Sequence, residues 1–124
     1  MLAVTVLTSL DERDIRQLGY PVDLSELVRF RAKNAMEMGC DGVIASGLEA
    51  KSLRETLGDK AVIVTPGIRP LDYGRKDDQK RIVDPRQAFL NGADYIVVGR
   101  PILKADNPKA KAEEIQGIIV ELFS

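Results

Sequence analysis

Histidine and tryptophan are absent from this chain of 124 residues, and cysteine occurs only once. Without histidine the chain lacks the commonest acid–base group and metal ligand, so any catalysis must use carboxylates, lysines or a bound phosphate group. The single cysteine, Cys40, excludes an intrachain disulfide and fits a reducing cytoplasm. Because Cys40 directly precedes an apolar segment, we expect it to be an inert, buried thiol.

An excess of one charge and long apolar runs are also lacking. The 18 basic and 19 acidic residues nearly cancel, whereas a broad nucleic-acid footprint needs a basic surplus. The longest apolar runs are about 5–6 residues, too short to cross a bilayer, and the first residues do not resemble a signal peptide. We therefore expect a cytoplasmic protein that binds neither nucleic acid nor a membrane.

Short apolar runs alternate along the chain with segments of helical spacing. Strands are predicted at residues 2–8, 41–45, 61–65 and 93–98, each followed by a helix. The runs are continuous, which is typical of parallel strands covered on both faces. Four βα units with right-handed crossovers give an α/β fold in a single domain over residues 1–124. A complete (β/α)8 barrel takes roughly 250 residues, so the units form an open sheet or half of a TIM barrel.

Capping residues mark where the helices start and stop. Capping boxes are predicted at three places, Ser9–Glu12, Asp23–Glu26 and Ser46–Glu49. Two more helices should start at Asp84, which precedes a proline, and at Asn107. Glycines predicted to end helices are Gly19, Gly39, Gly58 and Gly92. A long loop is predicted over residues 66–80.

Groups suited to a phosphate ligand follow three of the predicted strands. The last strand ends in Gly99-Arg100: glycine lets a backbone N–H approach a ligand, and arginine offers a forked, permanently charged donor. The third strand leads into Pro66-Gly67-Ile68-Arg69, and the loop beyond it carries Gln79, whose amide can both donate and accept. Thr8 ends the first strand. Since ligands of α/β folds lie at the carboxyl ends of strands, these residues predict a site for a phosphorylated ligand.

Taken together, four segments resemble orotidine 5′-phosphate decarboxylase, the enzyme family that converts orotidine 5′-monophosphate (OMP) to UMP and carbon dioxide in pyrimidine biosynthesis. The segments are residues 4–9, 65–70, 77–81 and 95–101, in the family's order and spacing. The resemblance covers essentially the whole chain. It implies strands five to eight of a homodimeric (β/α)8 barrel that uses no metal or cofactor.

The resemblance also implies roles for individual residues. Arg100 and the Gly99 backbone would bind the 5′-phosphate, and Gln79 would close over the phosphate and the pyrimidine. Arg69 would help to fix the phosphate-binding loop. On the residues alone, other roles stay open: Gln79 can be a solvated loop amide, and Arg69 can pair with one of the aspartates at 77–78 to order the loop.

Two further residues are implied to contact the base of the nucleotide. Thr8 would contact the pyrimidine edge, and Pro66 would pack beside the base. On the residues alone, Thr8 can also be a β-branched strand residue that caps the next helix, and Pro66 with Gly67 forms a turn in either case. Ser46 is interpreted as a helix cap rather than a ligand.

The family's catalytic residues are an Asp-x-Lys-x-x-Asp motif and a preceding lysine, and no such motif occurs in this sequence. The lysine would protonate C6 as carbon dioxide leaves, and the aspartates would stress the substrate carboxylate. Lys76-Asp77-Asp78 is interpreted as a charged run in a loop. We therefore assign no catalytic residue and predict that the chain alone is inactive, because only interactions made in the transition state lower the barrier.

Other interpretations stay open beside this one. A half-barrel exposes two strand edges and the apolar inner face of its sheet. The chain can therefore be a non-catalytic, self-associating scaffold or a nucleotide-phosphate-binding module, and a second copy or a complementary amino-terminal half would cover those surfaces. A barrel acting on a sugar phosphate is a third possibility, which the segments at 66–69 and 77–79 disfavour.

Overall fold

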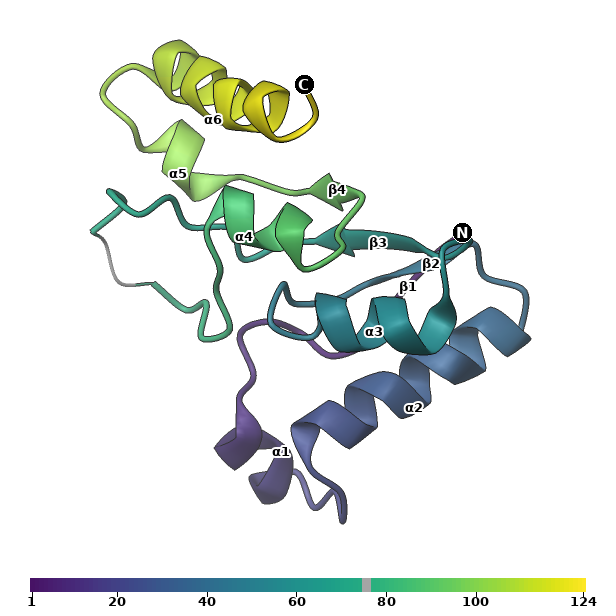
Figure 1. Ribbon diagram of the computed structural model, residues 1–124. Helices are drawn as coiled ribbons and strands as arrows, with labels where there is room; N and C mark the ends of the chain where they lie inside the picture. Colours follow the sequence, from purple (N-terminus) through teal and green to yellow (C-terminus); the bar gives the residue numbers. More distant parts are fainter. Residues whose placement is uncertain (75–76) are drawn as a thin grey trace.

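The computed structural model describes residues 1–74 and 77–124, and within these ranges strands and helices alternate as predicted (Figure 1). The strands are β1 (Leu2–Val4), β2 (Gly42–Ile44), β3 (Val62–Thr65) and β4 (Tyr95–Ile96). The helices are α1 (Glu12–Gln17), α2 (Leu24–Glu37), α3 (Ala50–Leu57), α4 (Pro85–Leu90), α5 (Arg100–Leu103) and α6 (Pro108–Leu122). Lys76, in the predicted charged run, lies outside the described residues.

All four strands are parallel and lie side by side in chain order, β1-β2-β3-β4. Because crossovers between neighbouring parallel strands are right-handed, a sheet that grows in one direction carries its connecting helices on one face. Accordingly, α2 packs against β2, α3 against β3 and α4 against β4. The last helix, α6, packs against α4 and α5 rather than against the sheet.

The opposite face of the sheet is left partly open, contrary to the prediction of strands covered on both faces. Val43 and Ile63 point to the helices and are fully buried, whereas Val4 and Tyr95, whose side chains alternate to the other face, are 55% and 63% exposed. The continuous apolar runs are thus buried on one side within the described residues, because only that side faces the crossover helices.

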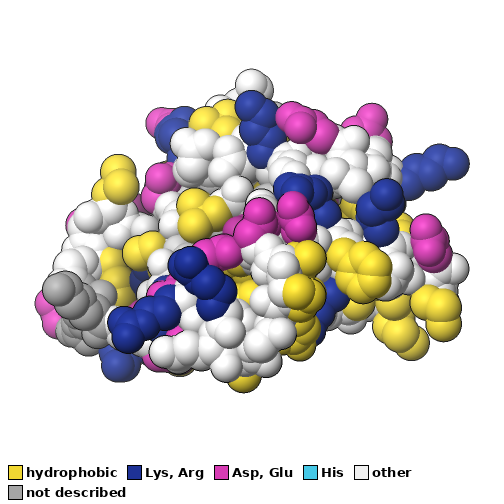
Figure 2. Space-filling view, turned by 90° about the horizontal axis from the view of Figure 1, so that it is seen from below, with side chains coloured by type: hydrophobic (Ala, Val, Ile, Leu, Met, Phe, Trp, Pro, Cys, Tyr) yellow, Lys and Arg dark blue, Asp and Glu magenta, His cyan; other side chains and the backbone are white. Residues whose placement is uncertain are grey.

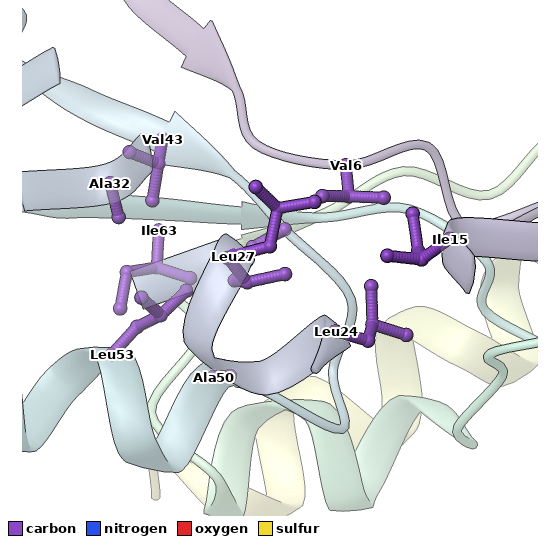
Figure 3. Packing of buried hydrophobic residues seen from close by; sticks show 11 residues of the cluster. Val6, Ile15, Leu24, Leu27, Ala32, Val43, Ala50, Leu53 and Ile63 are labelled. Atoms are coloured by element: carbon purple, nitrogen blue, oxygen red, sulfur yellow. The ribbon is translucent and has the colours of Figure 1, made fainter. Parts of the chain in front are cut away.

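The main hydrophobic core lies between the sheet and the helices α2 and α3 (Figure 3). Val43 and Ile63 of the sheet meet Leu27 and Val28 of α2 and Leu53 of α3, and each is at most 5% exposed. Fully burying one such side chain contributes about 1.5–3 kcal/mol. A second, smaller cluster joins the segment after β3 to α4; it consists of Ile68, Val83, Ala88 and Ala93.

Two strands end earlier than predicted. β1 stops at Val4, although Thr5 still donates its N–H to the carbonyl of Ile44 (3.1 Å), and a turn follows in which Leu10 donates to Leu7 (3.0 Å). β4 stops at Ile96, and its exit forms the short helix α5, which the sequence did not predict. Each strand keeps one more bond to its neighbour, from Thr5 to Ile44 and from Val97 to Thr65 (2.9 Å), before the chain turns away from the sheet.

Most helix ends agree with the sequence, although among the described residues only the Asp23 half of the capping box predicted at Asp23–Glu26 is present. Asp23, Asp84 and Asn107 each accept the N–H of the third residue after them, at 2.8, 3.1 and 3.1 Å, and start α2, α4 and α6. The four glycines predicted to end helices all have positive φ, a region that favours glycine because it has no Cβ. These features form between residues that are close in sequence, which explains the agreement.

The capping box predicted at Ser9–Glu12 is wrong by two residues. The N-cap of α1 is Asp11, whose carboxylate accepts the Asp14 N–H (3.0 Å), while the Asp14 carboxylate accepts the Asp11 N–H (2.9 Å). Glu12 instead accepts the N–H of Leu24 at the start of α2 (3.0 Å). The glutamate is therefore occupied in joining two helices.

The capping box predicted at Ser46–Glu49 is also wrong. α3 begins only at Ala50, and its N-cap, Glu49, makes no side-chain capping bond. The Ser46 hydroxyl accepts the N–H of Leu48 (3.1 Å) and donates to the carbonyl of Arg81 (3.4 Å). A tertiary contact thus takes the hydroxyl that was expected to cap the helix.

Cys40 is a half-buried free thiol, rather than the fully buried one expected, because it lies in the connection between α2 and β2. In the described part of the chain, no helix combines the length and the apolar character needed to cross a membrane. On the face drawn in Figure 2, basic and acidic side chains lie interspersed, with hydrophobic side chains between them.

Candidate functional site

The candidate site lies at the edge of the sheet where the strands end. Thr8 follows β1, residues 66–69 follow β3, and Arg100 begins α5 just after β4. These segments leave the sheet on the side opposite the N-terminus (Figure 1). In parallel α/β folds this edge is the usual place for a ligand.

Thr8 and Gln79, 71 residues apart in sequence, lie in direct contact: the Thr8 hydroxyl donates to the Gln79 side-chain oxygen. The backbone N–H groups of Lys80 and Arg81 both donate to the carbonyl of Thr8, at 3.2 and 3.1 Å. The return segment, residues 79–83, therefore crosses the end of the β1 segment. Thr8 does not cap α1, which excludes the role left open for it as a helix cap.

Gly67 permits this crossing. It has a φ of +72°, and a Cβ at this position would lie 3.0 Å from the carbonyl oxygen of Arg81 and 3.4 Å from the side-chain oxygen of Gln79. Beside it, Arg69 donates its N–H to the carbonyl of Val83 (2.9 Å). A larger residue at Gly67 would push the return segment away from the end of β3.

Arg69 and Arg100 are brought together by two aspartates of the long loop. Arg69 contacts one carboxylate oxygen of Asp77 through Nε (3.0 Å) and Nη2 (2.7 Å). Arg100 contacts Asp78 through Nη1 (2.5 Å), and its Nε lies 3.7 Å from Asp77. The pairing of Arg69 with an aspartate, left open by the sequence, is therefore present.

The charges of these groups reinforce one another. Burial opposes ionisation of Asp77, but the Gln79 N–H and the guanidinium groups of Arg69 and Arg100 outweigh it and hold the pKa of Asp77 below its ordinary value. The hydrogen bond from Arg100 lowers the pKa of Asp78, and the same bond raises the pKa of Arg100. Asp77, Asp78 and Arg100 are therefore ionised at neutral pH.

Asp77 also connects the two arginines to the segment that carries Gln79. Its second carboxylate oxygen accepts the N–H of Gln79 at 3.0 Å. Arg69, Asp77 and Gln79 line a cavity of about 740 Å³ between the long loop and α4. Thr8 and Arg100 lie beside this cavity rather than in its lining.

The two remaining predicted residues, Gly99 and Pro66, lie just after β4 and β3. Gly99 is the N-cap of α5, and a Cβ there would meet nothing within 4 Å. Pro66 is half-buried directly after β3. Open space beside Gly99 leaves its backbone accessible to a ligand.

Two residues of this region escaped the sequence analysis, Arg81 and Glu49. The Arg81 side chain is 5% exposed and lies 2.8 Å from the Glu49 carboxylate. An arginine in a charged run, and a glutamate expected in a capping box, both have the appearance of surface residues in sequence. Within residues 1–74 and 77–124, no group of three or more acidic or cysteine side chains is placed to hold a metal ion.

Parallel strands in chain order, helices on one face and polar loops gathered at the strand ends define a parallel α/β protein of the barrel type. A model of the orotidine 5′-phosphate decarboxylase / HUMPS family matches residues 1–115, and the chain belongs to this family. The family resemblance inferred from the four sequence segments is thereby confirmed.

Individual relatives agree with this assignment. Orotidine 5′-phosphate decarboxylase of Methylococcus capsulatus is 52% identical over 124 residues, which is 100% of this chain and 51% of that protein. The crystal structure of orotidine 5′-phosphate decarboxylase from Lactobacillus acidophilus is 42% identical, with a TM-score of 0.77 over 94% of this chain and 47% of that one. The structure of the Pyrococcus horikoshii enzyme is 30% identical, with a TM-score of 0.59 over 82% of this chain and 47% of that one.

The chain spans about half the length of the curated relatives it matches. Its four parallel βα units match half of the barrel of these structures, so the predicted fold class, half of a TIM barrel, is confirmed.

Proposed function

We propose that this chain forms the phosphate- and pyrimidine-binding half of an orotidine 5′-phosphate decarboxylase, the enzyme that converts OMP to UMP and carbon dioxide. The observation that carries the proposal is the gathering of Arg69, Gln79 and Arg100 around Asp77, at the strand ends of a chain belonging to this family. These groups supply charge and hydrogen bonds suited to a phosphate.

In this proposal each predicted residue has one task. Arg100 and the Gly99 N–H bind the 5′-phosphate, and Gln79 spans from the phosphate to the pyrimidine. Thr8, which holds the Gln79 side chain, contacts the pyrimidine edge, and Pro66 packs beside the base. Arg69 acts through Asp77, because its guanidinium is engaged there and orders the loop.

The chemical step lies outside these groups. Protonation of C6 and loss of carbon dioxide are assigned to the family's Asp-x-Lys-x-x-Asp motif, which this sequence lacks. The chain alone therefore binds and orients the nucleotide but does not accelerate decarboxylation. Turnover that rises in proportion to the concentration of the purified chain would contradict this part of the proposal.

The open face of the sheet supports a further element of the proposal, assembly. Residues 1–124 act as a single half-barrel domain, with Val4 and Tyr95 exposed on the face opposite the helices. A second copy, or a complementary amino-terminal half, covers this face. If the chain binds no nucleotide, the same exposed face favours the alternative of a self-associating scaffold.

Calorimetric titration of UMP into the full chain tests the proposal. We expect saturable binding that Arg100→Ala weakens about 10- to 100-fold, because a hydrogen bond to a charged group contributes about 1.5–3 kcal/mol. Lys104→Ala is the matched control, since Lys104 carries the same charge at the other end of α5 and is exposed. Absence of UMP binding by the folded chain, or equal losses in both variants, would contradict the proposal.

Competition separates the substrate classes. If the chain recognises the base as well as the phosphate, UMP displaces ribose 5-phosphate and is bound more tightly, since Gln79 and Thr8 add contacts beyond the phosphate. Equal affinity for both ligands would favour the alternative of a site for a sugar phosphate.

A further inference from the structure

Arg81 lies buried beneath the candidate site. Only 4% of the residue is exposed. Its Nη2 donates to the carbonyls of Val6 (2.9 Å) and Leu7 (3.1 Å), and its Nη1 lies 2.8 Å from the Glu49 carboxylate. One guanidinium thus joins the segment after β1 to the residue that precedes α3.

The backbone of Arg81 makes two further connections. Its N–H donates to the carbonyl of Thr8 (3.1 Å), and its carbonyl accepts the hydroxyl of Ser46 (3.4 Å). Two residues further on, Val83 donates its N–H to the carbonyl of Gly67 (3.4 Å). Arg81 therefore lies where the return segment meets the segments that follow β1, β2 and β3.

The ion pair of Arg81 and Glu49 is held by charge more than by hydrogen bonds. Among the described residues, Arg81 Nε and Nη1 and the Glu49 oxygen nearest to them have no partner of good hydrogen-bond geometry. Buried pairs of this kind add little net stability compared with apolar residues, yet removing one partner is costly. Their best-attested use is to fix one arrangement among several.

We propose that Arg81 and Glu49 are a positioning pair that fixes Gln79 and Thr8 in the geometry for binding the pyrimidine nucleotide. The inference rests on the proposed function, and it adds two residues that act on the ligand only through Gln79 and Thr8. Gln79 precedes Arg81 by two residues, a span of at most about 7 Å, so anchoring Arg81 restricts where the Gln79 amide can reach. Without the pair, the return segment separates from Thr8. The Gln79 side chain is then no longer held beside the Thr8 hydroxyl.

A role in overall stability alone predicts something different. Loss of the pair would then weaken all parts of the fold together and would affect every ligand alike. A positioning role predicts a loss confined to residues 79–83 and to ligands that use Gln79 and Thr8.

Glu49→Gln tests the proposal first by hydrogen exchange without ligand. The variant keeps the shape of the side chain but leaves Arg81 without its counter-charge. We expect the Lys80 and Arg81 amides, both bonded to Thr8, to lose protection about tenfold more than the sheet amide of Ala45, which donates to Val64. An equal loss at all three amides would overturn the proposal.

Ile63→Val is the matched control for this measurement, because Ile63 is fully buried in the main core cluster, which includes no residue of the return segment. It should lower protection at the three amides by similar factors. Arg81→Lys retains the charge but not the fork that reaches both carbonyls and Glu49, so it should resemble Glu49→Gln.

Ligand titration provides the second test. Glu49→Gln should weaken UMP about tenfold, and it should change the affinity for ribose 5-phosphate less than about twofold, since Arg100 on α5 still meets the phosphate. Equal weakening of both ligands, or of neither, would overturn the positioning role. If the unaltered chain binds no UMP, the proposed function fails, while the exchange measurement still decides what the pair does to the return segment.

Discussion

At the scale of single residues, Asp77 and Asp78 play different parts around Arg100, the side chain to which the proposal assigns the phosphate. Asp78 accepts from Arg100 at 2.5 Å, and both side chains are partly exposed. Asp77 is only 11% exposed in its side chain and serves two arginines and a backbone N–H. Asp77 therefore orders the site, whereas Asp78 competes for the guanidinium that a ligand would use.

Asp78→Asn should strengthen UMP binding by at most about fivefold, because the ion pair with Arg100 is exposed and weak and the ligand no longer has to replace it. Calorimetric titration measures the change. The control is Asp59→Asn, which alters the net charge equally in an exposed turn away from the site. If both variants bind UMP equally well, general charge rather than competition at Arg100 explains the effect.

At the scale of elements, the long loop is tied to α1 at its carboxyl-terminal end. Lys80 on its return segment pairs with Asp14 of α1 (2.8 Å) and lies 3.5 Å from Asp11. The hydrogen bonds from Lys80 and from the Asp11 N–H together lower the pKa of Asp14 to about 2, and the contact with Asp14 raises the pKa of Lys80. α1 thus stabilises the segment that carries Gln79.

The stability that this contact contributes depends on pH, because folding lowers the pKa of Asp14. Because the pKa of Asp14 falls from 3.8 to about 2 on folding, its stabilising effect is complete above pH 3.8 and is lost as the pH falls toward 2. In an NMR titration of the Asp14 carboxyl carbon, Lys80→Gln should raise the pKa of Asp14 part of the way to 3.8, since the Asp11 N–H still lowers it. An unchanged midpoint would mean that Lys80 does not hold α1 to the loop.

The start of α4 also shapes the candidate site, because α4 forms one wall of the cavity. Asp84→Ala removes the side-chain bond to the Gln87 N–H and should lower the free energy of unfolding by about 1 kcal/mol. Denaturant unfolding measures this loss. Asp106→Ala, at an exposed residue just before the N-cap of α6, should leave the midpoint almost unchanged; equal losses would show that the cap is not the cause.

At the scale of the whole molecule, the sheet as described over residues 1–74 and 77–124 has two free edges and one open face. β1 and β4 are the edge strands, and exposed Val4 and Tyr95 lie in the same row of the sheet as Ile44 and Val64. Unpaired edges and exposed apolar side chains favour association. The same strand order that places the helices on one face therefore leaves Val4 and Tyr95 exposed on the other, which supports the proposed assembly.

We expect the chain to self-associate, and Val4→Lys to weaken that association by placing a charge on the open face. Light scattering across a dilution series measures the molar mass. Leu18→Lys provides the control, since Leu18 is 63% exposed at the end of α1, away from the sheet. A monomer at every concentration would remove the support for assembly.

Local features of this protein are determined by the sequence itself. Asp23, Asp84 and Asn107 cap helices by bonding to residues three positions away, and glycines end four of them, so short-range energetics decide these points. The alternation of strands and helices, and with it the fold class, also follows from the spacing of apolar residues that are close in sequence. The segments at the strand ends are sufficient to indicate the family.

Only the tertiary structure decided which polar side chains meet. Arg81 contacts a carbonyl 75 residues away, Thr8 contacts Gln79 across 71 residues, and Ser46 is drawn from its expected cap by a partner 35 residues away. The short β1 and β4, the helix α5 and the one-sided cover of the sheet likewise depend on how the units pack. Such contacts gain their energy from burial and from charges brought together by folding, which no pattern of neighbouring residues encodes.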